Sequence, residues 1–304
     1  RGTYAQVRLA YPQHDEKLAM AVKIIDKSRF AHENSQIVSN GRRRLTIDIH
    51  DEVNILKSVN HLNIVKVYDV IETSKNIYIF LQLVEGGDLF EYIQNHGYVP
   101  EKEAKYFFFQ MSLAIKYLHD QKIAHRDIKP ENILLEKTPL LSRLLLTDFG
   151  MARVTSSTAF SSTMRTVCGT LQYLAPEVMS SPPTGKLSES ASTGYGLSVD
   201  CWALGVTLYL MLSGSLPFHA VDPETGKDAE SDKVEGKLLF DQIKEANPPF
   251  PSCIWSKISS DARDMVKSLL VASPAERMTV DGIFSHPWIS SSLKSLRAVY
   301  RRTV

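Results

Sequence analysis

The stretch HRDIKPEN, residues 125–132, decides how the rest of the chain is interpreted. The letters DFG at residues 148–150 begin sixteen positions after Asn132, and the letters APE follow at residues 175–177. At roughly one position in twenty for each residue type, five fixed letters (His, Arg, Asp, Lys, Asn) at this spacing arise by chance on the order of once in a few million starting positions. The ordered set of three motifs is therefore informative about function.

Residue patterns outward from these motifs predict a strand-rich first part and a helical second part. Alternating β-branched and aromatic residues predict two hairpins, formed by residues 4–11 with 18–25 and by residues 64–71 with 77–84. Apolar spacing predicts a helix over residues 48–59 between the hairpins, and later helices over residues 104–118, 200–212, 260–270 and 279–284. The last 11 residues, from Lys294, are basic with little periodicity and are expected to form a tail.

Composition places the chain among globular proteins. The 304 residues are 43% hydrophobic, which is enough for a sizeable core, and 35 Lys and Arg nearly balance 34 Asp and Glu. A net charge of +1 gives no reason to expect direct binding to nucleic acid or a membrane surface. The apolar run at residues 202–212 is shorter than a membrane span and predicts a buried helix. Three scattered cysteines fit a reducing compartment, so we expect an intracellular protein, nuclear or cytoplasmic.

The three motifs resemble those of the protein kinase family, and the resemblance extends over nearly the whole chain. It implies an α+β, two-lobed fold, with a small antiparallel β-sheet lobe that has one main helix and a larger, mostly α-helical lobe. The implied bounds are 1–84 for the small lobe, 85–289 for the large lobe with an activation segment at 148–177, and 290–304 for the basic tail. The chain starts at Arg1, so we expect it to begin inside its own phosphate-binding loop.

The resemblance implies an ATP-dependent phosphotransferase and assigns four catalytic residues. Asp127 is expected to accept or orient the proton of the attacking hydroxyl, and Lys129 to steady the transferring phosphate. Lys23 matches the strand lysine that binds the α- and β-phosphates, with Glu52 as its expected partner. A solvated helix face is the alternative for Glu52, because acidic residues at 48 and 51 lie nearby.

ATP and Mg²⁺ are the implied cofactors. Asn132 and Asp148 are expected to hold Mg²⁺ through side-chain oxygens, the ligands that this hard cation prefers. The implied nucleotide site also includes the Gly-rich loop, the adenine-flanking positions, the hinge and a ribose contact: Gly2, Val7, Ala21, Lys23, Leu81, Gln82, Leu83, Asp88 and Leu134. Ala5 stands where the third loop glycine is expected, and the first would precede Arg1. The apolar members of this set are equally compatible with ordinary core packing.

Two features imply that the substrates are Ser or Thr residues of proteins. Lys129 lies in the form of the catalytic loop found in Ser/Thr kinases, and Thr170 matches a threonine that contacts the catalytic Asp in them. Asp88 and Glu131 match positions that meet substrate arginines in basophilic relatives, which favours an arginine upstream of the target hydroxyl. Simple solvated surface is the alternative for these two acids.

Control by phosphorylation of the activation segment is implied by Arg126, which precedes the catalytic Asp. Thr166 matches the usual phosphosite, and its phosphate would pair with Arg126 and order the segment. An upstream activating kinase or trans-autophosphorylation would supply that phosphate. Glu177 is expected to pair with Arg277, and Asp200 to begin the buried helix as a scaffold residue.

The segments around residues 164–177 and 199–206 resemble the calcium/calmodulin-dependent-kinase group, and within it the checkpoint effector kinases that carry a forkhead-associated (FHA) domain. That resemblance implies a role in DNA-damage or meiotic checkpoints. A calmodulin-regulated kinase of the same group is the nearest alternative. A pseudokinase scaffold is disfavoured because Lys23, Glu52, Asp127, Lys129, Asn132 and Asp148 are all of the required type, and a small-molecule kinase is disfavoured by Thr170.

Overall fold

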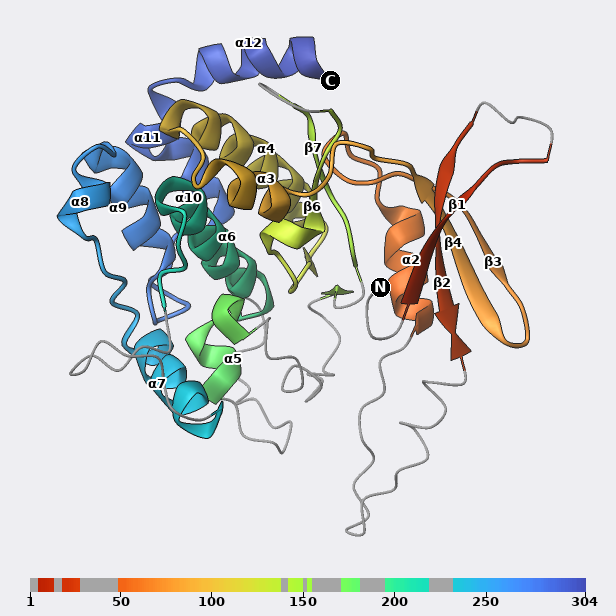
Figure 1. Ribbon diagram of the computed structural model, residues 1–304, viewed down its shortest axis with the longest axis horizontal. Coiled ribbons are helices and arrows are strands. Elements are labelled where there is room, and N and C mark those ends of the chain that lie inside the picture. The colour runs from red at the N-terminus through yellow and green to blue at the C-terminus, as the bar shows by residue number, and fades with distance from the viewer. Residues whose placement is uncertain are drawn as a thin grey trace.

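Four strands form an antiparallel sheet in the small lobe. The computed structural model describes residues 5–13, 18–27, 49–137, 142–149, 152–154, 171–180, 195–218 and 232–304. The sheet order is β1-β2-β4-β3 (Figure 1), with β1 at Ala5–Ala10, β2 at Met20–Asp26, β3 at Val67–Glu72 and β4 at Asn76–Gln82. Both predicted hairpins are confirmed, because β1 pairs with β2 and β3 with β4, each antiparallel. Ile77 and Ile79 alternate into the core from β4, as period-2 patterning requires.

Helix α2 (Ile49–Ser58) confirms the helix predicted between the hairpins. In Figure 1 it lies between the sheet and the larger lobe. Val53, Ile55 and Leu56 are buried, so the helix presents an apolar side to the protein interior. This placement brings α2 to the boundary where the two lobes meet.

The large lobe is built around two long helices, α4 (Glu101–Asp120) and α6 (Tyr195–Ser213), which pack against each other. Three consecutive phenylalanines of α4 are buried and reach different partners. Phe107 meets Tyr92, Phe108 meets Trp288, and Phe109 meets both Phe284 and Tyr300. The helix is therefore buried on several sides. It is not an amphipathic helix with a single apolar face.

Helix α6 is the buried helix that the apolar run predicted, although it extends beyond residues 202–212 at both ends. Within the described part of the chain, its window Gly196–Ser213 is the one segment long and apolar enough to cross a membrane by length and composition. Most of that window is buried inside the lobe, where α6 packs against α4 and α9 (Ser260–Leu269). The core of a globular lobe accounts for its apolar character.

Shorter elements complete the large lobe around these helices (Figure 1). The short strands form two antiparallel pairs, β5 with β8 and β6 with β7. The remaining elements are α3 (Leu89–His96), β5 (Ile123–Ala124), η1 (Pro130–Asn132), β6 (Ile133–Leu135), β7 (Leu144–Leu146), β8 (Arg153–Val154), η3 (Leu171–Tyr173), α5 (Pro176–Ser180), α7 (Asp232–Glu245), α8 (Ser252–Trp255), α10 (Val280–Ser285), α11 (Pro287–Ser290) and α12 (Leu293–Thr303).

The connection from β4 to α3 joins the two lobes and runs close against β6. The Gly86 N–H donates to the Leu135 carbonyl at 3.0 Å. A Cβ added to Gly86 would lie 2.2 Å from that carbonyl oxygen, so the approach requires glycine. Gly87, at φ 76°, then turns the chain into the helix, where Asp88 is the N-cap.

The predicted C-terminal tail is wrong, because residues 293–303 form helix α12. Leu296 is buried, and Leu293, Val299 and Tyr300 pack against the core. These positions recur at three- and four-residue steps, which is a helical pattern. The basic residues between them lie on the exposed side of the helix. They dominate the composition of the segment, so the helical spacing of its apolar residues is easily overlooked.

Candidate active site

One buried carboxylate holds the backbone of residues 125–126. Asp200, in α6 and 0% exposed, accepts hydrogen bonds from the backbone N–H groups of His125 (2.9 Å) and Arg126 (2.8 Å). Arg126 has a φ of 67°, in the left-handed region that residues other than glycine seldom adopt. The paired hydrogen bonds offset the cost of that conformation, so α6 fixes the turn that carries Asp127.

His119 of α4 supports the same carboxylate, with Nε2 2.8 Å from Asp200 Oδ2. Burial acts to raise the pKa of the Asp200 carboxyl. The hydrogen bonds from His119 and from the Arg126 N–H outweigh this effect and hold the pKa below its ordinary value. The carboxylate is therefore ionised inside the lobe, where an unpaired charge would be costly.

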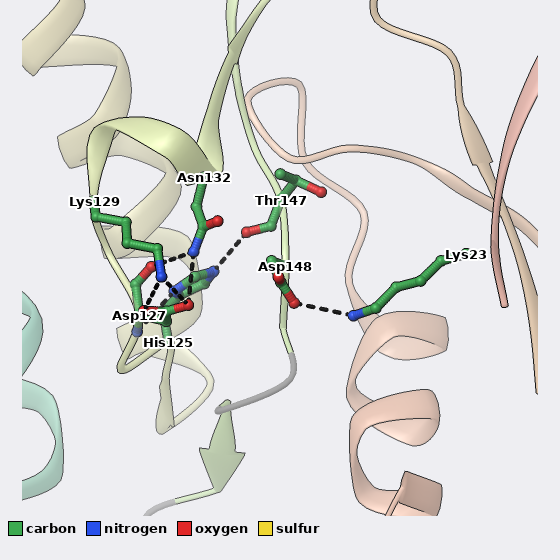
Figure 2. Close-up of polar contacts among 7 residues, drawn as sticks. All are labelled: Lys23, His125, Asp127, Lys129, Asn132, Thr147 and Asp148. Atoms are coloured by element: carbon green, nitrogen blue, oxygen red, sulfur yellow. Dashed lines mark hydrogen bonds and ion pairs between the residues drawn. The ribbon is translucent and has the colours of Figure 1, made fainter. Parts of the chain in front are cut away.

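Two side chains of the loop at residues 125–132 converge on the Asp127 carboxylate (Figure 2). Lys129 Nζ lies 2.9 and 3.0 Å from its two oxygens. Asn132 Nδ2 donates to Asp127 Oδ2 and to the Asp127 backbone carbonyl, both at 2.8 Å. The carboxylate is thus fixed in orientation, and the two hydrogen bonds assign which end of the Asn132 amide is nitrogen.

His125 links the catalytic loop to the residue that precedes Asp148 (Figure 2). Burial lowers the pKa of His125 despite the raising effect of the nearby acids, so the ring is neutral at neutral pH. Its Nδ1 accepts from the Asp127 N–H at 3.3 Å, and Nε2–H donates to the Thr147 carbonyl at 3.2 Å. Phe149 packs edge-on against the ring, with centroids 4.8 Å apart.

Asp148 pairs with Lys23 across the lobe boundary. Lys23 Nζ, from β2, lies 3.0 Å from Asp148 Oδ1. The lysine side chain is 16% exposed and the aspartate 47% exposed, so the pair is partly accessible to solvent. Asp148 has a φ of 62°, so its backbone also adopts the left-handed region. The structure thus brings these two predicted site residues together, while their roles stay predictions.

The oxygens available beside this pair suit Mg²⁺. Because Asn132 directs its amide nitrogen to Asp127, its Oδ1 is left on the side of Thr147 in Figure 2. Within the described ranges, no group of three or more His, Cys, Asp or Glu side chains is placed to hold a metal ion. One carboxylate and one amide oxygen fit a cation that takes few protein ligands and completes its shell with phosphate and water.

The predicted adenine-flanking residues come from strands of both lobes. Val7 and Ala21 come from β1 and β2, with Val7 opposite Lys23 and 65% exposed, and Ala21 opposite Leu81 of β4. Leu134 comes from β6 in the large lobe. Residues Gln82 and Leu83 follow directly in the connecting segment, where both are partly exposed. The apolar residues of the predicted set thus come from both lobes.

Two acids predicted to meet substrate arginine lie near each other and near the catalytic loop. Asp88 caps α3 by accepting from the Glu91 N–H at 2.8 Å. The pKa of Glu131 is raised first by desolvation, and the charges of Asp127 and Asp88 add to the rise. Their mutual repulsion marks a concentration of negative charge that a cationic side chain would relieve.

Several predicted residues lie outside the described part of the structure. Gly2, Thr166 and Thr170 fall in the ranges that are not described, and so does the side chain of Glu52, whose backbone lies in α2. Their roles stay predictions.

The predicted scaffold pair is confirmed. Arg277 donates from both terminal nitrogens to the Glu177 carboxylate, at 2.6 and 2.7 Å, and both side chains are buried. The guanidinium also donates to the Ser198 carbonyl and lies over the Trp202 ring, 5.2 Å from its centroid. A bidentate pair of this kind locks the segment after η3 onto α6 and the residues that precede α10.

Sequence reasoning missed His119, Asn63 and Gln110, which are polar and buried. His119 was hidden within an apolar helical run, although a polar residue in such a run is a signal of a buried partner. Asn63 and Gln110 lie in different elements, and nothing in their sequence spacing shows that they meet.

Sequence comparison finds one protein family and several individual proteins that are similar to this chain. A family model described as protein kinase domain matches residues 1–289. The chain is 36% identical over 301 residues, 99% of its length and 45% of the relative's, to "Probable serine/threonine-protein kinase fhkC" of Dictyostelium discoideum. It is 37% identical over 296 residues, 97% of its length and 39% of the relative's, to "Serine/threonine-protein kinase DCLK3" of Homo sapiens. The chain spans less than half the length of these curated relatives.

Proposed function

The chain belongs to the protein kinase family, and from that premise we propose that it transfers the γ-phosphoryl group of ATP to Ser or Thr side chains of proteins. The observation that carries the proposal is the convergence of Lys129 and Asn132 on Asp127, with Asp148 paired to Lys23 beside them. The printed names of the similar proteins, which are serine/threonine-protein kinases, support the choice of acceptor.

Phosphoryl transfer depends on alignment and charge neutralisation more than on covalent help from the protein. Asp127, held in orientation by its neighbours, would accept or orient the proton of the attacking hydroxyl. Lys129 would steady the transferring phosphate while remaining close to Asp127. The family generally uses ATP with Mg²⁺, and Asn132 and Asp148 would hold the metal. When bound, Mg²⁺ would supply charge neutralisation for the phosphates.

Lys23 would exchange Asp148 for the α- and β-phosphates, with Glu52 as its other expected partner. The present Lys23–Asp148 pair shows that the ammonium reaches the metal-binding carboxylate from β2. Val7, Ala21, Leu81 and Leu134 would flank the adenine, Gln82 and Leu83 would offer backbone groups to it, and Asp88 would contact the ribose. Gly2 would let backbone N–H groups approach the phosphates.

We infer a preference for arginine upstream of the target hydroxyl, from the negative charge shared by Asp88 and Glu131. Phosphorylation of Thr166, by an upstream kinase or in trans, would place a dianion for Arg126 to bind and so order the activation segment. Thr170 would contact Asp127 when the segment is ordered.

The biological setting that we propose is checkpoint signalling after DNA damage or in meiosis, in the nucleus or cytoplasm. Its support is the amino-acid sequence at residues 164–177 and 199–206, which resembles the sequences of FHA-containing checkpoint effector kinases. Residues before Arg1 that encode an FHA domain would support this assignment. A calmodulin-dependent gain of activity would favour the alternative within the same group.

The decisive experiment measures Mg²⁺-dependent transfer of labelled phosphate from ATP to a peptide with one Ser and an upstream arginine. We expect Lys23→Met to lose at least about a hundredfold in kcat/KM, since it removes a charge that contacts the transferring nucleotide. Lys27→Met is the matched control, because Lys27 follows β2 directly and pairs with Glu72 at the surface. Equal turnover by the wild-type protein and Lys23→Met would support the pseudokinase alternative instead.

A further inference from the structure

A buried asparagine between α2 and β3 is fully engaged in hydrogen bonds that reach three separate elements. Asn63 is 1% exposed, and its Nδ2 donates to Gln110 Oε1 at 3.0 Å and to the Leu144 carbonyl at 2.8 Å. Both amide protons are thereby used. Its Oδ1 needs a donor, which Tyr300 of α12 supplies through its hydroxyl at 2.6 Å.

The tyrosine is well suited to remain that donor. Burial, together with the nearby Tyr106, raises the pKa of Tyr300 to about 12, so the hydroxyl keeps its proton at physiological pH. Its ring packs edge-on against Phe109 of α4, with centroids 6.1 Å apart. Figure 1 shows α12 lying across the large lobe above α4. The hydroxyl is therefore positioned by the docking of the whole helix.

The other end of this network holds strand β7, which leads into the active site. Gln110 accepts from the Leu144 N–H at 3.0 Å and donates to the Ser142 carbonyl at 3.0 Å. The Leu146 N–H donates to the Asn63 carbonyl at 2.8 Å, and the Val65 N–H donates to the Leu146 carbonyl at 3.0 Å. On its opposite edge β7 pairs with β6. Asp148 follows β7 after one intervening residue, Thr147.

We propose that Tyr300 is a positioning residue for phosphoryl transfer, which acts through Asn63 on β7 and so on the placement of Asp148. The inference rests on the proposed kinase function. It makes α12 part of the catalytic apparatus, although the helix does not touch the reacting atoms. Loss of the hydroxyl leaves the Asn63 oxygen buried without its donor, and the strand edge that Asn63 holds becomes looser.

The test compares Tyr300→Phe with Tyr209→Phe, which removes a buried hydroxyl that donates to the Pro249 carbonyl elsewhere in the same lobe. Both variants lose one hydrogen bond and keep the ring. Amide exchange of Leu144 and Leu146, measured by NMR without nucleotide, should accelerate about tenfold in Tyr300→Phe, as expected for one buried hydrogen bond. Tyr209→Phe should leave these two amides unchanged.

Kinetics supply the second measurement. We expect kcat of Tyr300→Phe to fall about fivefold and the Mg²⁺ concentration for half-maximal rate to rise, with the peptide KM unchanged, since the defect lies at Asp148. In an Asn63→Ala background, Tyr300→Phe should have no further effect on either quantity. The proposal is overturned if Tyr300→Phe matches Tyr209→Phe in exchange and in kinetics.

The proposed kinase function and the positioning role of Tyr300 can be refuted independently of each other. A wild-type protein that transfers no phosphate would overturn the kinase function, while the exchange comparison would still decide whether α12 controls β7. If Asn63→Ala does not fold, the two tyrosine variants alone decide the inference.

Discussion

Replacing the buried Asp200 by asparagine should destabilise the large lobe and impair catalysis together. The Asp200 carboxylate offers one oxygen to each of two backbone N–H groups: Oδ2 accepts from His125 and Oδ1 accepts from Arg126. An amide has one oxygen, so in either orientation an NH₂ group faces one of these donors. A buried donor left unsatisfied costs about 1–3 kcal/mol, and loss of a charge-assisted bond adds about 1 kcal/mol or more. We therefore expect the free energy of unfolding to fall by about 2–4 kcal/mol.

The assay is equilibrium urea unfolding of wild-type, Asp200→Asn and a matched control, Asp264→Asn. Asp264 also pairs with a histidine, His286 Nε2 at 3.1 Å, but its side chain is 69% exposed. Exposed pairs of this kind contribute about 0–1 kcal/mol, so the control should unfold nearly as the wild type does. Asp200→Asn should also reduce kcat, because Arg126 loses a bond that holds its left-handed φ.

The pH dependence has a definite sign. Because the folded-state pKa of Asp200 is lowered, its ionisation stabilises the fold above the unfolded-state value near pH 3.8, and this contribution is lost as pH falls through the lowered folded-state pKa. The stability difference between wild type and Asp200→Asn should therefore shrink in acid. Equal unfolding free energies for Asp200→Asn and Asp264→Asn at pH 7 would refute the reasoning.

Two further predictions concern substrate choice and control. Glu131→Gln should reduce the preference for a peptide with upstream arginine over its alanine counterpart by about tenfold, because one charge-assisted contact is lost; kcat/KM for the two peptides measures this ratio, and an unchanged ratio would contradict the assignment. Thr166→Ala should abolish the activation of an otherwise fully phosphorylated preparation, with restoration of activity on rephosphorylation seen only in the wild type. Full activity of Thr166→Ala would exclude control through this residue.

Local structure could be predicted where one kind of signal dominates. The alternation in β4 places Ile77 and Ile79 in the core, and the paired runs of β-branched and aromatic residues predicted both hairpins. The same reasoning failed at α12, because the basic residues of the exposed side outweigh the spacing of Leu293, Leu296 and Tyr300. A helix held by a narrow apolar stripe is easily mistaken for a polar tail.

Only those residues of the candidate site that belong to recognisable sequence motifs could be predicted. Asp127 and Asn132 lie in one loop, so their proximity follows from sequence. The resemblance assigned Lys23 and Asp148 to the same nucleotide site but gave Glu52, not Asp148, as the partner of Lys23. No spacing rule joins Asn63 to Tyr300, which lie 237 positions apart. Such contacts arise from tertiary packing, because the position of each side chain depends on where the helix or loop that carries it lies in the fold.

The electrostatics of the site also limit which group can take a proton from the substrate. His125 lies two residues before Asp127, but burial lowers its pKa. Its Nδ1 is already accepting from the Asp127 N–H, and its Nε2–H is directed to the Thr147 carbonyl. Protonation at Nδ1 would break the first bond and place a charge in the interior, which is costly. The ring is therefore committed to positioning, and this supports the proposal that the Asp127 carboxylate, which Lys129 holds, takes the hydroxyl proton.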